Sequence, residues 1–208
     1  MKKRIPQVTV ERLPLYHRSL KMLEEMGREN VSSIDLGQML QIMPEQIRKD
    51  LSIFGKFGRR GLGYPVTELK NKIESILGLR YGWRIGIVGI GHLGSALANY
   101  DNFSALGFTI AALFDIDEKI IGSEVNGFKV YDFGKFESLM PRKKIDIGII
   151  TVPAAAAQKV SDTLTKSGVK AIWNFTPVTL EVPLRVQVVN EDFSVGLGAL
   201  SFYLAKKY

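Results

Sequence analysis

The chain has 208 residues, of which 46% are hydrophobic, and this length and composition are those of a globular protein with one large or two small domains. It contains no cysteine, which excludes disulfide bonds, thiolate metal sites and a thiol nucleophile, and it has no run of 18 apolar residues that would predict a membrane-spanning helix. The net charge of +7 belongs mainly to residues 1–80, which have 15 Lys and Arg against 9 Asp and Glu, whereas residues 81–208 have 13 against 12.

The basic N-terminal section indicates a polyanionic partner, although a solvated basic surface would have the same charge. The basic start, Met1 to Arg4, is not followed by an apolar stretch long enough for a signal peptide, so we expect a cytoplasmic protein. Residues 13–27 predict a first helix, with Tyr16 and Leu20 on one side and Gly27 as its C-terminal stop.

The next two segments predict a helix-turn-helix. Ser32 followed by Asp35 is the pattern of an N-cap with a carboxylate three residues on. Pro44 suits the first turn of a second helix over residues 44–54, and Gly55 ends it. A short turn separates the two predicted helices.

Polar side chains of this second helix and of the segment after it are suited to DNA. Arginine pairs with guanine, glutamine with adenine, and lysine with phosphate. Residues 56–64 resemble a short hairpin with two arginines at its tip, the pattern of a wing. The alternative is a small helical domain with ordinary surface charges. The expected DNA contacts are Gln46, Arg48, Lys49, Ser52, Lys56, Arg59, Arg60 and Tyr64.

A glycine-rich loop follows the first predicted strand of the second section, which we expect to begin near residues 78–82. The strand, residues 84–90, leads into a G-x-G-x-x-G sequence made of Gly89, Ile90, Gly91, His92, Leu93 and Gly94. In such loops the first glycine permits a tight turn, the second lets the backbone approach a pyrophosphate, and the third lets helix and strand pack closely. The loop therefore predicts a dinucleotide site.

A carboxylate at the end of the next predicted strand, residues 108–115, supports this prediction. Asp115 comes 21 positions after Gly94, where a residue that binds an adenosine ribose diol is expected. It would repel a 2′-phosphate, so NAD(H) is favoured over NADP(H). It would also oppose the ribose phosphate of coenzyme A.

The remaining pattern alternates apolar runs with helical segments, which predicts an α/β fold with a doubly wound parallel sheet. Further strands are expected at 146–152, 169–175 and 186–190, with an extended piece at 127–131, and helices at 92–101, 133–140 and 154–167. Residues 190–208 read as an amphipathic helix with Phe193, Leu197, Leu200 and Leu204 on one face. Such a tail packs either on its own domain or on a partner subunit.

The sequence argues against an enzyme. Neither histidine, His17 or His92, is placed as a general acid beside a nicotinamide ring, and too little chain follows the sheet for a substrate domain. The competing hypotheses are a small NAD-dependent oxidoreductase with a basic accessory domain and a regulator that responds to coenzyme A.

Several motifs together resemble the Rex redox-sensing transcriptional repressors over essentially the whole chain. They are the residues 12–18 (RLPLYHR), 46–52 (QIRKDLS), 54–55 (FG) and 61–64 (GLGY), then 89–94, 114–115, 151–153 and 174–177. The resemblance implies a winged helix-turn-helix domain (1–80), a Rossmann-like NAD(H) domain (81–189) and a C-terminal helix (190–208) that a homodimer exchanges between its subunits.

The resemblance also implies the activity and further site residues. The protein would bind palindromic operator DNA when NADH is low and be released by NADH, the preferred form of the cofactor. Arg18, Tyr100 and Asp192 would link the DNA domain, the cofactor domain and the partner's tail helix. Further cofactor contacts would come from Thr151, Val152, Pro153, Asn174, Thr176 and Pro177, and from Phe193, which would lie near the partner's nicotinamide.

Overall fold

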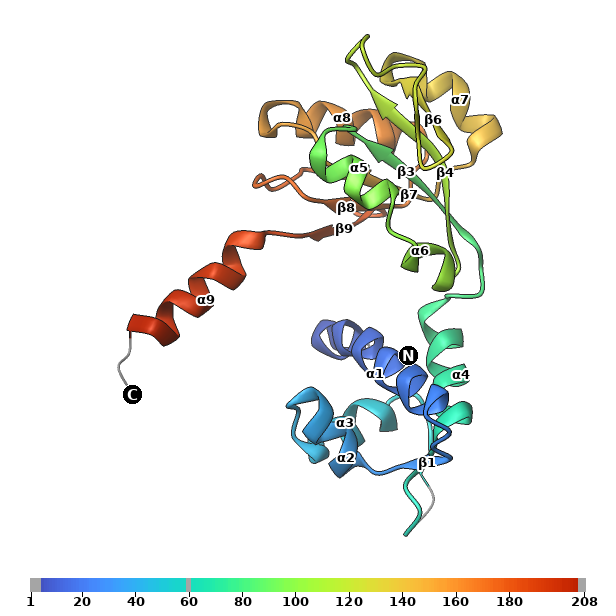
Figure 1. Ribbon diagram of the computed structural model, residues 1–208, viewed down its shortest axis with the longest axis vertical. Coiled ribbons are helices and arrows are strands. Elements are labelled where there is room, and N and C mark those ends of the chain that lie inside the picture. Colours follow the sequence, from blue (N-terminus) through green and yellow to red (C-terminus); the bar gives the residue numbers. More distant parts are fainter. Residues whose placement is uncertain (1–4, 59–60, 206–208) are drawn as a thin grey trace. The chain divides into compact units, whose positions relative to one another are not determined.

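The computed structural model describes residues 5–58 and 61–205 and divides into two compact units, Met1–Tyr81 and Gly82–Tyr208 (Figure 1). The division lies one residue beyond the boundary expected from the sequence. Arg59 and Arg60, which we expect to contact DNA, lie outside the described residues.

The N-terminal unit is a helical domain with a short two-stranded ribbon. Leu13 and Leu20 of the first helix pack in one core with Ile47 and Leu51 of the third. Ser32 and Asp35 form the expected reciprocal cap. The elements are α1 (Gln7–Glu25), β1 (Asn30–Val31), α2 (Ser33–Leu40), α3 (Pro44–Ser52), β2 (Tyr64–Pro65) and α4 (Val66–Leu77). The helix-turn-helix prediction is therefore confirmed by α2 and α3.

Two details of this unit differ from the expectation. Helix α1 begins at Gln7 rather than residue 13 and continues through Pro14, because its N-terminal turns bury Thr9 and Leu13 and this packing offsets the backbone bond that proline cannot donate. The paired hairpin expected over residues 56–64 does not occur in the described part of this segment, since residues 55–58 form no strand and β2 pairs antiparallel with β1 instead.

The C-terminal unit is an α/β domain built on a seven-stranded sheet of order β5-β6-β4-β3-β7-β8-β9, parallel except for β5. Its strands are β3 (Trp83–Val88), β4 (Phe108–Asp115), β5 (Glu124–Val125), β6 (Phe128–Asp132), β7 (Ile147–Ile150), β8 (Ala171–Asn174) and β9 (Gln187–Asn190). The doubly wound prediction is confirmed.

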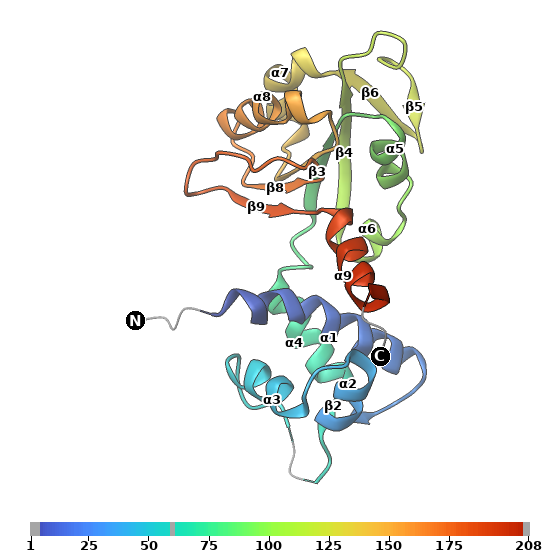
Figure 2. The ribbon, with the colours of Figure 1, turned by 90° about the vertical axis from the view of Figure 1, so that its left-hand side faces the viewer.

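Helices cover both faces of this sheet, with α5 and α6 on one side and α7 and α8 on the other (Figure 2). Strand β4 supplies both cores, because Leu113 points to one face while Phe114 points to the other. The helical elements are α5 (His92–Ala98), α6 (Asn102–Ala105), the 3₁₀ turn η1 (Phe133–Lys135), α7 (Phe136–Lys143), α8 (Ala154–Lys166) and α9 (Phe193–Ala205).

The tail helix differs from the amphipathic helix expected over residues 190–208. Asn190 belongs to β9, and α9 starts at Phe193. It has no charged residue and no polar face, and none of its residues is buried within the chain; Leu197 is 69% exposed and Leu204 83%. A helix that is apolar all round is normally covered. No helix of residues 5–58 and 61–205 has the length and apolar character needed to cross a membrane.

Candidate functional site

The glycine-rich loop lies where the winding of the sheet reverses. From β3 the chain moves outward through β4 to β6, and from β7 it moves the opposite way through β8 to β9. Because β3 and β7 are neighbours, the loops at their carboxyl ends are forced apart and leave a crevice between them. This is the place at which doubly wound sheets bind their ligands.

A cleft of about 560 Å³ occupies this position. It gathers seven of the residues predicted to bind a cofactor, from three separate loops: Gly89, Ile90, Gly91, Asp115, Thr151, Val152 and Pro153. Sequence reasoning missed the apolar residues that complete its wall, which are Ile116, Ile120, Phe133, Ala156 and Val160. They give the cleft an apolar wall beside its polar loop residues. Their only signal in the sequence is their position shortly after a strand end.

The three glycines of the loop have the three environments that a dinucleotide site requires. Gly89 turns the chain with a φ of +95°, a conformation that side chains disfavour. A Cβ at Gly94 would overlap the carbonyl oxygen of Gly89 and lie 3.0 Å from Thr151 Oγ1. Around Gly91, by contrast, a Cβ would meet no described atom within 4 Å. The open side of the loop at Gly91 is where a phosphate can reach the backbone.

Two polar side chains brace the loop. The carboxylate of Asp115 accepts hydrogen bonds from the backbone N–H groups of Ile90 (2.5 Å), Ile116 (2.7 Å) and Asp117 (3.0 Å). The Thr151 hydroxyl lies 2.7 Å from the carbonyl oxygen of Gly89, to which it donates. Asp115 thus stands half-buried at the wall of the cleft, and these three bonds leave one of its four lone pairs, on Oδ2, available to a ribose diol.

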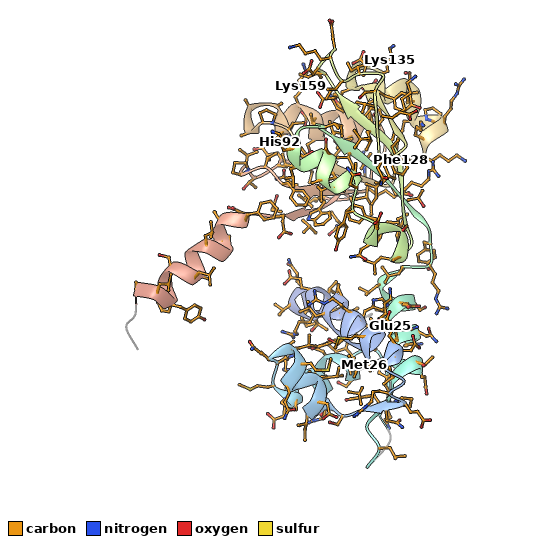
Figure 3. The ribbon with its side chains drawn as sticks, in the orientation of Figure 1. Glu25, Met26, His92, Phe128, Lys135 and Lys159 are labelled. Atoms are coloured by element: carbon orange, nitrogen blue, oxygen red, sulfur yellow. The ribbon has the colours of Figure 1, made fainter. Side chains whose placement is uncertain are left out.

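The other predicted cofactor residues have different environments. His92, exposed at the first turn of α5 (Figure 3), and Leu93 do not line the cleft. Asn174 is fully buried: its amide oxygen accepts from the N–H and hydroxyl of Thr176, and its amide nitrogen donates to Val178 O and Asn190 Oδ1. In this structure Asn174 and Thr176 therefore shape the loop that carries Pro177 and do not present polar groups at the surface.

A row of aromatic rings crosses the same unit. Phe103 lies edge-on to both Tyr100 (5.2 Å between centroids) and Trp173 (6.3 Å). Trp173 packs on Phe175 at 4.6 Å, and Phe175 lies 5.9 Å from Phe193, the first residue of α9. The row joins two positions for which a role in the response is expected, Tyr100 and Phe193.

The three residues expected to form the interdomain link are all exposed. Arg18 lies on the surface of α1, and the Tyr100 hydroxyl accepts a hydrogen bond from Asn102 at 3.0 Å. Asp192 caps α9, because its Oδ1 accepts from the N–H of Ser194 at 2.8 Å. The hydroxyl and the backbone N–H of Ser194 lower the pKa of Asp192, which keeps this carboxylate charged.

The surface of α3 carries part of the expected DNA-binding set. Arg48, Lys49, Ser52 and Lys56 are exposed, and Arg48 donates to Ser33 Oγ of α2 at 2.8 Å. This hydrogen bond holds the guanidinium at the surface shared by the two helices.

Two members of the expected DNA-binding set need correction. Tyr64 is 9% exposed and packs in the core of the unit, where burial raises the pKa of its hydroxyl. Gln46 donates its Nε2 to Asp50 at 2.8 Å, so its amide does not have both groups free for a bidentate contact with adenine. Both side chains support the unit instead.

Asp50, the carboxylate that holds Gln46, is fully buried between α3 and α1. It accepts from Arg12 Nε (2.6 Å) and Nη2 (2.8 Å), from Tyr16 OH (2.6 Å) and from Thr9 Oγ1 (3.0 Å). Burial alone would raise the pKa of Asp50, but these hydrogen bonds, with that from Gln46, outweigh burial and lower it to about 2.

This carboxylate predicts a specific loss of stability in acid. A depressed pKa stabilises the folded state above the ordinary pKa of aspartate, and this contribution is lost as the pH falls through the folded value. We expect about 2 kcal/mol to disappear between about pH 4 and pH 2. Urea unfolding of wild type and Asp50→Asn at several pH values measures it: the wild type should lose its advantage over the variant in that window. A constant difference between the two proteins would contradict the prediction.

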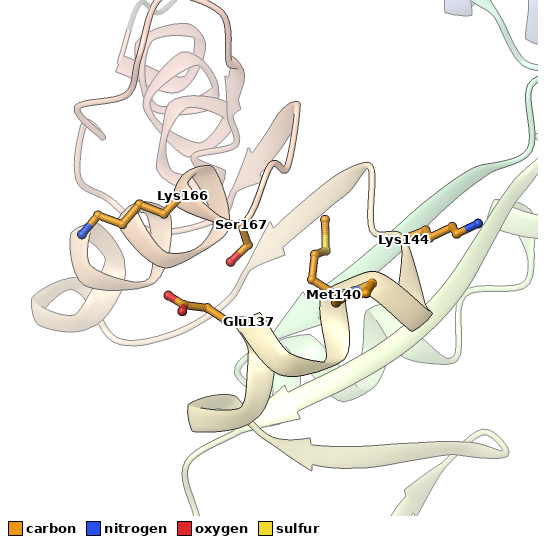
Figure 4. A pocket seen from close by; sticks show the side chains of 6 residues that line it. Glu137, Met140, Lys144, Lys166 and Ser167 are labelled. Atoms are coloured by element: carbon orange, nitrogen blue, oxygen red, sulfur yellow. The ribbon is translucent and has the colours of Figure 1, made fainter.

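A second hollow, of about 690 Å³, lies between α7 and the end of α8 (Figure 4). Its wall includes Glu137, Met140, Lys144 and Ser167, and the side chain of Lys144 points away from those of Glu137 and Ser167. The charged groups diverge rather than converge, so this hollow lacks the arrangement of a ligand site.

Both units are similar to known proteins. Residues 4–52 match the family "Putative DNA-binding protein N-terminus", and residues 80–178 match the family "CoA binding domain". A redox-sensing transcriptional repressor Rex from Syntrophomonas wolfei is 50% identical over 97% of this chain and 96% of its own, and one from Chloroflexus aurantiacus is 44% identical over 97% and 95%.

Solved structures agree with these relatives. A Rex-family repressor called RSP, in complex with β-NAD⁺ and operator DNA, matches with a TM-score of 0.91 at 39% identity, covering 97% of this chain and 93% of its own. The same repressor with β-NADH matches with a TM-score of 0.89 at 38% identity, over 96% and 94%. The similarity therefore extends over both units.

Proposed function

The chain belongs to the Rex family of redox-sensing transcriptional repressors, and from this premise we propose that it represses transcription from an inverted-repeat operator until NADH releases it. The observation that carries the proposal is 50% identity over 97% of the chain to a repressor of this family. These relatives are repressors, and we propose no reaction for this chain. We also propose a cytoplasmic location, as expected for a repressor whose relatives come from bacteria.

We propose NAD(H), with NADH preferred, as the ligand of the cleft at Gly89–Gly94. The pyrophosphate would lie on the loop at Gly91, and the ribose diol of the adenosine half would bind Asp115. Asp115 would repel the 2′-phosphate of NADP(H). The nicotinamide half would contact Thr151, Val152, Pro153, the loop that Asn174 and Thr176 shape at Pro177, and the partner's Phe193.

The response must come from the nicotinamide ring, because NAD⁺ and NADH have every other part in common. A ligand shifts a conformational equilibrium only by its differential affinity for the two states. An apolar site near Phe193 would disfavour the cationic ring of NAD⁺, which loses more hydration on burial than neutral NADH. NADH would thus stabilise a state that NAD⁺ does not.

We propose that the protein acts as a homodimer and that α9 is the helix exchanged between subunits. The apolar and exposed surface of α9 supports this, since such a helix needs a cover. In the NADH-bound dimer, Arg18, Tyr100 and the partner's Asp192 would form a polar link. Binding to both half-sites needs the two recognition helices about 34–36 Å apart, one turn of DNA, and the link would change this distance. The dimer could then no longer bind both half-sites.

Gel-shift titration with an inverted-repeat duplex selected by the protein tests this function. We expect a complex without cofactor and with NAD⁺, and its loss with NADH; NADPH should act weakly. Equal effects of NAD⁺ and NADH would overturn the redox response.

Coenzyme A is the second candidate ligand, because the family that matches residues 80–178 is named for it. If coenzyme A fails to displace NADH, it is not the ligand. Hydride transfer from NADH to any acceptor would instead favour the hypothesis that the protein is an oxidoreductase.

Arg48→Ala should weaken operator binding by about 10- to 100-fold at every cofactor concentration, because one guanidinium in the groove contributes about 1–3 kcal/mol. Fluorescence anisotropy with labelled duplex measures the loss. Glu45→Ala, at a more exposed position of the same helix, is the control and should bind at least as tightly as wild type. Unchanged binding by Arg48→Ala would mean that α3 is not the recognition helix.

A further inference from the structure

We propose that the buried carboxylate of Asp50 sets the orientation of α3 on α1 and is therefore a positioning residue for sequence-specific operator recognition. The inference rests on the proposed function, in which α3 enters the major groove. It concerns a side chain that cannot itself touch DNA, because none of its surface is exposed.

The first argument is the direction of the hydrogen bonds. Thr9, Arg12 and Tyr16 follow one another at spacings of three and four on α1, so they lie on one face of that helix, and all three donate to Asp50. Arg12 donates through two nitrogens, one to each carboxylate oxygen. Four directed bonds from α1 to one carboxylate define both the rotation and the translation of α3 relative to α1, which Figures 1 and 2 show near each other.

The second argument is that apolar packing alone would leave the rotation of α3 less defined. Ile47 and Leu51 bury the same face of the helix, but such contacts have no direction, and a helix of nine residues offers few of them. Asp50 directly follows Arg48 and Lys49 in the chain. A rotation of α3 about its axis would therefore displace both side chains expected to reach the DNA.

The third argument is electrostatic. A negative charge in a DNA-binding unit weakens its attraction to phosphate, and a buried ion pair often adds little stability compared with apolar side chains. Here the donors keep the carboxylate charged, and the pKa of Arg12 is raised mainly by its hydrogen bond to Asp50. The arrangement is explained better by the geometry that it specifies than by stability or by affinity for DNA.

The experiment compares affinity for two duplexes: the inverted repeat selected by the wild type from a random library, and the same bases scrambled. Asp50→Asn removes the ion pair, while Tyr16→Phe and Thr9→Val each remove one donor from a buried position on α1. Asp35→Asn is the control, because it removes an equal charge from an exposed position in the same unit, while the amide oxygen can still accept the hydrogen bonds from Ser32 that cap α2. Urea unfolding and NADH titration accompany each variant.

Positioning predicts a loss of discrimination. The ratio of affinities for the two duplexes should fall about 10- to 100-fold in Asp50→Asn and about 3- to 10-fold in Tyr16→Phe and Thr9→Val, with scrambled-duplex and NADH affinities maintained. If charge alone mattered, Asp50→Asn and Asp35→Asn would both bind the two duplexes more tightly.

The single-donor variants keep the test decisive if Asp50→Asn fails to fold. Folded variants with an unchanged ratio, or with an equal loss on both duplexes, would overturn the positioning role. A wild type that does not discriminate between the duplexes would instead overturn the proposed function.

Discussion

Replacement of Gly94 by alanine is expected to abolish NADH binding and to destabilise the C-terminal unit by about 2–4 kcal/mol. The new methyl group would overlap the carbonyl oxygen of Gly89. The Gly89 peptide cannot easily move away, because two hydrogen bonds hold it. Its N–H donates to Phe114 O at 2.8 Å, and its carbonyl oxygen lies 2.7 Å from the Thr151 hydroxyl. Relief of the overlap would therefore shift α5 away from β3. Urea unfolding and NADH fluorescence titration measure the two effects.

Gly91→Ala is the matched control. A methyl group at this position meets no described atom within 4 Å, and the φ of −76° is ordinary for alanine, so we expect nearly wild-type stability. NADH binding should nevertheless weaken, since the methyl group lies where the phosphate approaches. A Gly94→Ala protein as stable as Gly91→Ala would contradict the close packing of loop and helix. Wild-type NADH affinity in Gly91→Ala would mean that the pyrophosphate lies elsewhere.

Glutamates in α9 are expected to convert the dimer into a monomer and so to weaken operator binding by about 100-fold or more, the advantage that two linked half-site contacts provide. The double variant Leu197→Glu with Leu200→Glu places two charges on a helix that otherwise has none. Both leucines are exposed within the single chain, so the substitutions should leave the fold of each unit intact. Any loss then comes from the partner subunit, where a buried unpaired charge is costly.

Sedimentation velocity and operator titration of the same samples test this result. Gln187→Glu, which adds a charge at an exposed position of β9, is the control and should remain dimeric with wild-type affinity. A double variant that stays dimeric would show that α9 does not form the dimer interface. A monomer that still binds the full operator as tightly as wild type would show that dimerisation does not contribute to affinity.

The features that could be predicted from the sequence are those encoded by neighbouring residues. Ser32 and Asp35 form the cap that their spacing indicates, because both partners belong to one turn of helix. The residues 89–94 form the loop that their glycines indicate, since its conformation needs a positive φ at Gly89 and lacks room for a side chain at Gly94. Asp115 ends its strand beside this loop and contacts Ile90, as a diol-binding carboxylate should.

The features that could not be predicted depend on partners far away in the chain. Gln46 is the exception, because its partner Asp50 lies four residues on in the same helix, a spacing at which a glutamine and an aspartate side chain meet. The donors Thr9, Arg12 and Tyr16 lie 34 to 41 residues from Asp50, so no local pattern joins them. Tyr64 was misassigned for a similar reason: its strand pairs with β1, 33 residues earlier, and this turns the ring into the core.

The sequence by itself thus determined which segments become the helix-turn-helix, the glycine loop and the parallel sheet, because capping, glycine conformation and apolar periodicity act over a few residues. The tertiary structure alone decided which polar side chains face the solvent, which apolar residues line the cleft, and that α9 emerges with its apolar surface uncovered. Those outcomes depend on long-range packing and on hydrogen bonds between helices, and single-residue chemistry does not encode them.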